Sequence, residues 1–207
     1  MSMSPEEAAV EEAIDRLAEE LYEDHKYRAI DEFISERLTS FYVSNPMVMR
    51  PAVEAIQEGK RLQSNGHNAA ALVFFVTAIE VLLKATLLRP VLYGLIHNEA
   101  VAEIFVQEAI KQTGFDRYEK LIANLFEELA GDQLNEVTRQ HAERPILSEC
   151  KQLQKIRNGI VHRGDKCETT DAERARLVAI AVFERVVRPV LYRIGLDVVE
   201  KGQIVAT

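Results

Sequence analysis

Cysteine is scarce in this sequence, since only Cys150 and Cys167 occur among 207 residues. Two cysteines do not provide the disulfide framework that small secreted proteins use in place of a large core. The first residues also lack the order of a signal peptide, because Pro5-Glu6-Glu7 stands where a basic and then an apolar segment would be. We therefore expect a protein of the reducing cytoplasm.

An uninterrupted apolar run long enough for a membrane span is also missing. The longest candidate, within residues 69–88, is broken by Thr77, Glu80 and Lys84. Charged side chains are costly inside a bilayer, whereas a helix that is apolar on nearly all sides is common in the core of a bundle. We expect residues 69–88 to form a buried helix, and we expect no membrane partner.

The sequence patterns of several large enzyme classes are absent. The chain has no glycine-rich P-loop, no H-E-x-x-H zinc helix, no C-x-x-C pair and no nucleophile elbow. His25, His67, His97 and His141 are far apart in sequence, and we expect each at the surface or at a helix cap rather than in a metal site. These absences favour chemistry that needs neither a metal nor another cofactor.

Strand-like alternation is nearly absent, and helical periodicity dominates the chain. With 47% hydrophobic and 28% charged residues, the composition is typical of a globular protein, and 207 residues can bury one substantial core. We expect a single all-α domain over residues 1–207, without an internal repeat. Its core should be formed by about 46–89 and 145–195, with an acidic N-terminal helix at 4–44 and a helical insert at 90–144.

Turn and cap residues divide this domain into helices. Ser4 and Pro5 suit the start of the acidic helix, and Asn45-Pro46 marks its end. The remaining helices are expected at about 46–64 before Asn65-Gly66, at 67–88 before Pro90, in shorter pieces over 91–144, directly after Pro145, and at 171–193.

The helix after Pro145 carries an arginine where an apolar side chain is expected. Ile146, Leu147, Cys150, Leu153, Ile160 and Val161 fall on one side of a helical wheel, and Arg157 lies near the middle of that stripe. A guanidinium stays charged and is costly to desolvate. Arg157 should therefore meet a buried carboxylate, a subunit interface or an anionic ligand.

The other flank of this helix is polar. Lys151, Lys155, Asn158 and His162 recur at spacings of four, three and four, so they line up along the helix. Gly159 leaves the backbone open to close approach, and Gly164 suits the C-cap, which would put His162 in the last turn. The alternative is an ordinary amphipathic helix with a capped end and a chance histidine.

The sequence Arg157-Asn158-x-x-x-His162 resembles the R-x4-H motif of HEPN domains. The similarity extends to the apolar helix that carries Glu80, where Ala78-x-Glu80-x-x-Leu83-Lys84 resembles an earlier helix of that family, and it covers about residues 46–195. The resemblance implies a HEPN-like helical bundle of four core helices, here with an N-terminal helix and a helical insert.

The resemblance also implies an activity, that of a metal-independent endoribonuclease. RNA supplies its own 2′-hydroxyl as the nucleophile, so the protein needs only proton transfer, charge stabilisation and positioning. By this resemblance His162 is the general base or acid, Arg157 stabilises the scissile phosphate, and Asn158 positions the reacting groups. The products would be a 2′,3′-cyclic phosphate and a 5′-hydroxyl.

Partners follow from the same resemblance. HEPN ribonucleases typically act as homodimers with a composite active site, in a toxin–antitoxin or antiviral defence setting, so an antitoxin or defence-system partner is expected. In some toxin members a tyrosine two residues after the histidine is modified. Gly164 occupies that position here, so control by this route is not expected.

Glu80 is the expected partner of Arg157, and its carboxylate would orient the guanidinium. The alternative is that Glu80 pairs with Lys84, four residues later on the same helix. Either pairing would put an acidic side chain within the bundle.

Charge is distributed unevenly along the chain, whose net charge is −8. Residues 1–60 contain 14 acidic and 6 basic side chains, whereas residues 61–207 contain 19 of each. Near the motif only Glu149 and Asp165 oppose a set of cations that could contact RNA, namely Lys151, Lys155, Arg157, Arg163 and Lys166. We expect a small positive patch with weak, salt-sensitive RNA binding.

Two other functions fit the same residues. A non-catalytic HEPN module could bind RNA or a nucleotide with Arg157 and His162 as anion ligands. A helical assembly or interaction protein could use the same two side chains structurally. Replacing His162 with alanine would abolish cleavage in an enzyme, weaken binding in a binding module, and change mainly stability or oligomeric state in an assembly protein.

Overall fold

The computed structural model describes residues 33–95 and 115–207, with a few single residues outside these ranges. Those single residues are Asp15, Arg16, Glu19, Tyr22, His25, Lys26, Arg28, Ala29 and Ile104. The expected helix start at Ser4 and Pro5, and most of the first half of the expected insert, lie outside the described residues.

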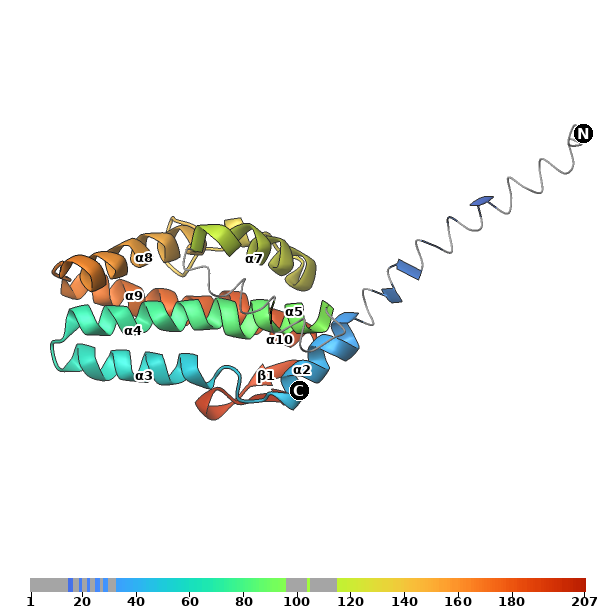
Figure 1. Cartoon of the computed structure of the whole chain (residues 1–207), viewed down its shortest axis with the longest axis horizontal. Coiled ribbons are helices and arrows are strands. Elements are labelled where there is room, and N and C mark those ends of the chain that lie inside the picture. Colours follow the sequence, from blue (N-terminus) through green and yellow to red (C-terminus); the bar gives the residue numbers. More distant parts are fainter. Residues whose placement is uncertain are drawn as a thin grey trace, which may run out of the picture.

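The described chain forms a helical bundle with one short β-hairpin, which confirms the expected all-α class (Figure 1). Its α-helices are α2 (Thr39–Ser44), α3 (Arg50–Ser64), α4 (Asn68–Val81), α5 (Arg89–Leu95), α7 (Phe115–Ala130), α8 (Ile146–Arg163), α9 (Thr169–Val182) and α10 (Arg188–Arg193). The π-helical segments are η1 (Phe33–Leu38), η2 (Leu82–Leu88) and η4 (Phe183–Val187), and the 3-10 turns are η3 (Leu134–Glu136) and η5 (Glu200–Gly202). The strands are β1 (Leu196–Val198) and β2 (Ile204–Ala206).

Helix α4 is the centre of the bundle because α3, α8 and α9 all pack against it. In Figure 1, α3 lies on one side of α4, and α8 and α7 run along the other. Gly59 of α3 lets the buried ring of Phe75 approach closely, since a Cβ at this position would lie only 2.6 Å from that ring. Because α3, α8 and α9 pack around it, α4 is apolar on nearly all sides.

The long helix that begins with α4 has the length and apolar composition of a possible membrane span over Asn68–Tyr93. In the bundle, 61% of its most apolar window is buried by other parts of the chain. The apolar side chains of this helix are therefore used mainly for packing within the protein, as expected for a core helix.

Two helical hairpins supply about half of the buried apolar residues. Helices α3 and α4 are joined at Asn65-Gly66, where Gly66 adopts a positive φ of 78°, as the sequence predicts. Helices α8 and α9 form the second hairpin. At the end where both hairpins turn, the Asn68 side-chain amide donates to the Thr169 hydroxyl at 2.9 Å, which fastens the first turn of α4 to that of α9.

Pro90 does not end the second core helix, contrary to expectation, since helical structure continues through η2 and α5 to Leu95. A proline ring clashes with the carbonyl four residues earlier and supplies no N–H for it. Here the π-helical turn before Pro90 is wider, because the Arg89 N–H bonds back five residues to the Lys84 carbonyl. The buried Tyr42 hydroxyl donates to the Thr86 carbonyl at 2.5 Å, and so replaces the missing proline N–H.

Tyr42→Phe should lower the free energy of unfolding by about 1–3 kcal/mol, because the ring is kept while the buried Thr86 carbonyl loses its donor. Pro90→Ala restores a backbone N–H four residues after Thr86. In that background we expect the cost of Tyr42→Phe to fall by roughly 1 kcal/mol. Urea denaturation of the four proteins measures this coupling, and an equal cost in both backgrounds would contradict it.

The last core helix also continues through a proline that follows a π-helical segment. The sequence Arg-Pro-Val-Leu-Tyr occurs at 89–93 and again at 188–192. Each copy follows a π-helical segment, and the two segments, η2 and η4, contact each other. The helix expected at 171–193 is observed from Thr169 to Arg193, with Pro189 inside it.

A C-terminal hairpin closes the bundle on the side of α2 and α3. Strands β1 and β2 are antiparallel, with Leu196 opposite Ala206. The Ile204 N–H donates to the Pro46 carbonyl at 2.8 Å, and residues 46–49 form a turn, so the helix expected from Pro46 begins at Arg50 instead. These contacts join the end of the chain to the segment between α2 and α3.

The connection between α7 and α8 folds back onto the first turns of α8. Val137 accepts the Ile146 N–H at 2.8 Å, and the Arg139 Nε lies 3.1 and 2.9 Å from the two carboxylate oxygens of Glu149. The Glu149 side chain is only 5% exposed and that of Arg139 is 22% exposed. This nearly buried ion pair fixes the start of the helix that carries the motif.

Candidate functional site

Helix α8 ends as the sequence predicts. Gly164 adopts a left-handed conformation with φ of 70°, and its N–H donates to the Ile160 carbonyl at 3.1 Å. The Asp165 N–H donates to the Gly159 carbonyl at 3.3 Å. His162 and Arg163 therefore lie in the last turn, where the helix dipole favours positive charge.

Arg157 and His162 lie on the same helix but do not face each other. Residues five apart are separated by about 140° around an α-helix and by about 7.5 Å along it. Asn158 and Val161 lie between them on the helix surface, and Val161 is 50% exposed although it is apolar. One chain thus presents the guanidinium and the imidazole at two edges of a single helix face.

The Arg157 guanidinium is half-buried and incompletely hydrogen-bonded. Its Nη1 donates to the Asn158 Oδ1 at 3.0 Å, whereas its Nε is buried and has no acceptor among the described residues. Arg174 of α9 also has a buried Nε without an acceptor in the described part of the chain. Since both Nε atoms are shielded from solvent, an acceptor from outside the chain would bind through the Nη groups of the half-buried Arg157 guanidinium.

Glu80 does not pair with Arg157 among the described residues, which corrects the expectation. Gln154 lies one turn before Arg157 on α8, and its Nε2 donates to the Glu80 Oε1 at 3.2 Å. The Glu80 charge also reaches the buried Tyr118 phenol, whose pKa is raised chiefly by burial and further by Glu80. The Lys84 ammonium lies 4.9 Å from the centre of the Tyr118 ring.

The expected RNA-binding cations divide into two groups. Lys151 pairs with Glu119 of α7 at 2.5 Å, and Arg163 pairs with Asp165 at 2.6 Å. Lys155 and Lys166 are exposed, as is His162. The positive patch is therefore smaller than the sequence suggests, because acidic neighbours on α7 and after the C-cap offset part of its charge.

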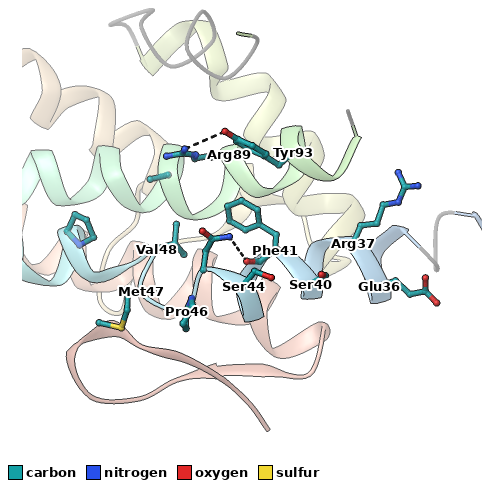
Figure 2. Close-up of a pocket in the computed structure, with 13 residues that line it drawn as sticks. Glu36, Arg37, Ser40, Phe41, Ser44, Pro46, Met47, Val48, Arg89 and Tyr93 are labelled. Carbon is teal, nitrogen blue, oxygen red and sulfur yellow. Dashed lines mark hydrogen bonds between the residues drawn. The ribbon is translucent and has the colours of Figure 1, made fainter. Parts of the chain in front are cut away.

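A surface groove that the sequence does not reveal lies between η1, α2 and the helix of η2 and α5 (Figure 2). Arg89 is stacked near Tyr93, with its guanidinium carbon 5.4 Å from the ring centre, and Tyr93 also contacts Phe41. Figure 1 shows α2 and α5 at one end of the bundle and the turn between α8 and α9 at the other. The groove is thus separate from the motif, and no histidine is among the described residues that line it.

The described part of the chain contains no group of three or more His, Cys, Asp or Glu side chains that could hold a metal ion. Both cysteines are free thiols, and burial is the main cause that raises the pKa of each. Cys150 is within the core, and Cys167 lies half-buried between α8 and α9.

Comparison with known proteins adds no assignment for this site. Scans against protein-family models and searches of curated proteins and of solved structures found no match to the chain. The residues of α8 and their surroundings are therefore the basis for a function of this chain.

Proposed function

We propose that this chain is a HEPN-type endoribonuclease that cleaves RNA without a metal and leaves 2′,3′-cyclic phosphate and 5′-hydroxyl ends. The observation that supports this most directly is the burial and incomplete hydrogen bonding of the Arg157 guanidinium. Its guanidinium is half-buried, its Nε has no acceptor among the described residues, and Glu80 accepts a hydrogen bond from Gln154 instead. Because no carboxylate among the described residues pairs with this guanidinium, an RNA phosphate would bind its Nη groups.

The proposed reaction is an internal displacement at phosphorus. A base takes the proton of the 2′-hydroxyl, the 2′-oxygen bonds to phosphorus, and the bond from phosphorus to the 5′-oxygen breaks as that oxygen takes up a proton. His162 is exposed, so its imidazole is accessible to RNA as the general base or acid of this reaction. Arg157 stabilises the charge that develops on the phosphoryl oxygens.

Asn158 has a more specific role in this proposal than its position in the sequence suggests. Its Oδ1 accepts the Arg157 Nη1 at 3.0 Å. The amide would therefore hold the guanidinium in the orientation that receives the phosphate, while its own N–H groups remain able to contact RNA. We infer that Asn158 positions Arg157 rather than transferring a proton.

Two copies of the chain would complete the site. The reaction needs both a base and an acid, whereas the motif offers one histidine, and Arg157 and His162 lie at two edges of their helix. The apolar Val161 between them is half exposed and would suit an interface. If the site is composite, mixing Arg157→Ala protein with His162→Ala protein should restore part of the cleavage that each lacks.

The toxin or antiviral setting and an antitoxin or defence-system partner remain predictions from the resemblance, and a cytoplasmic location remains a prediction from the sequence composition. A binding module is the second candidate function. It is favoured by the single histidine of the motif, because a monomer would present anion ligands without a second group for proton transfer. Analytical ultracentrifugation of the purified chain distinguishes the two functions. A dimer would favour the ribonuclease, and a monomer would favour the binding module.

The ribonuclease proposal is tested by incubating the purified protein with a labelled structured RNA and with DNA of the same sequence, in excess chelator. We expect fragments from the RNA alone, with 3′ ends that resist phosphatase until acid opens the cyclic phosphate. Binding of RNA without fragments from several different RNAs would favour the binding module. Cleavage of DNA as well would exclude the proposed nucleophile.

A further inference from the structure

Gly159 is buried although it lies on the solvent side of α8. The cover is formed by two side chains that are themselves exposed, Arg163 and Asp165, at 67% and 46%. A Cβ at Gly159 would lie 2.6 Å from the Arg163 Nη2, and closer still to a carboxylate oxygen of Asp165. A charged ion pair therefore rests directly on bare helix backbone.

The residues around Gly159 are cationic. Lys155, Gly159 and Arg163 are spaced four apart and form one row along α8, with His162 beside it. Long helical side chains lean toward the N-terminus, which explains why the Arg163 guanidinium lies over Gly159. The backbone at Gly159 is thus not covered by a side chain of its own. It is surrounded by the Lys155 ammonium, the Arg163 guanidinium and the His162 imidazole.

Asp165 places a carboxylate against the Arg163 guanidinium, a group that can also bind a phosphate. Carboxylates and phosphates bind a guanidinium through the same paired hydrogen bonds. The Arg163–Asp165 pair is exposed and separated by only two residues, so it contributes little stability and exchanges readily. Another anion can therefore displace the Asp165 carboxylate from this cationic surface.

We propose that the surface over Gly159 is a subsite for an RNA backbone phosphate, occupied in the free protein by the carboxylate of Asp165. This inference rests on the proposed function and adds to it. Around α8, Gly159 lies about 60° beyond His162 and about 160° from Arg157, so the subsite takes a phosphate on the far side of His162 from the scissile one. RNA binding breaks the Arg163–Asp165 pair, and Lys155 and Arg163 hold the incoming phosphate.

The test is the affinity of Asp165→Asn for a fluorescent RNA oligonucleotide in which every 2′-hydroxyl is methylated, so that it cannot be cleaved. We expect binding roughly 3- to 10-fold tighter than for the wild type at low salt, because Arg163 is freed for the phosphate. Arg163→Gln should weaken binding by a similar factor and reduce the salt dependence by about one phosphate contact.

Asp132→Asn is the matched control, since Asp132 is exposed in the connection after α7 and its replacement changes the net charge equally. Its affinity should stay within about 2-fold of the wild type. Equal effects of the two Asp→Asn changes, or no loss in Arg163→Gln, would overturn the subsite. Circular dichroism checks that all variants are folded.

The same proteins separate failure of the subsite from failure of the proposed function. If the wild type cleaves unmodified RNA but Asp165→Asn binds no more tightly than Asp132→Asn, the subsite alone is wrong. If the wild type neither binds the methylated RNA nor cleaves the unmodified RNA, both proposals are wrong.

Discussion

Arg157→Ala should reduce RNA cleavage by about 100-fold or more, because a group that stabilises charge in the transition state typically contributes a factor of that size. The fold should tolerate the change. No carboxylate among the described residues pairs with Arg157, so its removal leaves no buried charge without a partner and also removes an N–H that lacks an acceptor. Initial cleavage rates and thermal unfolding of the same preparation measure the two effects.

Arg174→Ala is the control for this prediction, since the Nε of Arg174 is also buried without an acceptor in the described chain. It should cleave RNA at the wild-type rate. Arg157→Lys keeps the charge but not the planar set of donors, so it should remain strongly impaired. Full activity in Arg157→Ala would exclude the proposed role, and an equal loss in Arg174→Ala would point to a general structural effect.

Arg139→Ala should lower the free energy of unfolding by about 3 kcal/mol. This value is at the lower end of the range for a broken buried ion pair, because the Arg139 side chain is 22% exposed. The cause is the Glu149 carboxylate, which would stay buried at the start of α8 without its two hydrogen bonds from the guanidinium. Chemical denaturation with a two-state fit measures the loss.

A double change distinguishes the ion pair from the packing of its side chains. Arg139→Met with Glu149→Leu removes both charges and keeps most of the volume, so much of the stability should return. Arg188 makes a similar two-oxygen contact with Asp197 at the surface, and Arg188→Ala should destabilise far less. Equal losses in Arg139→Ala and Arg188→Ala would show that burial of Glu149 is not the cause.

Features fixed by neighbouring residues in the sequence were predicted well. The turn at Asn65-Gly66, the helix after Pro145 and its C-cap at Gly164 are all observed. Each depends on local conformational preference, such as the left-handed conformation that glycine adopts without strain. The placement of His162 in the last turn follows from the same local rule.

Features that depend on residues far apart in the chain were missed. The helix passes through Pro90 because Tyr42, 44 residues away, donates to the Thr86 carbonyl. Gln154 rather than Arg157 reaches Glu80, because the rotation of α8 against α4 is set by packing across the whole bundle. The short β1–β2 hairpin gave no strand signal, since three residues are too few for a periodic pattern.

The position of the motif residues on one helix was predicted, but the partners of their neighbouring charged side chains were not. The motif residues do lie together near the end of α8, and two of the four expected RNA-binding cations have acidic partners. Glu119 comes from the expected helical insert, and the sequence gives no indication of its register against α8. Asp165 was seen only as a charge near the motif, whereas in the structure it covers Gly159.

The most direct test of the central claim is cleavage of one RNA with and without a single 2′-deoxy substitution at its mapped cleavage site, in chelator. We predict that the unsubstituted strand is cut there and that the substituted strand stays intact at that bond, because the nucleophile is the RNA's own 2′-hydroxyl. Cleavage of both strands at the same bond would contradict this account, and so would the absence of cleavage in either.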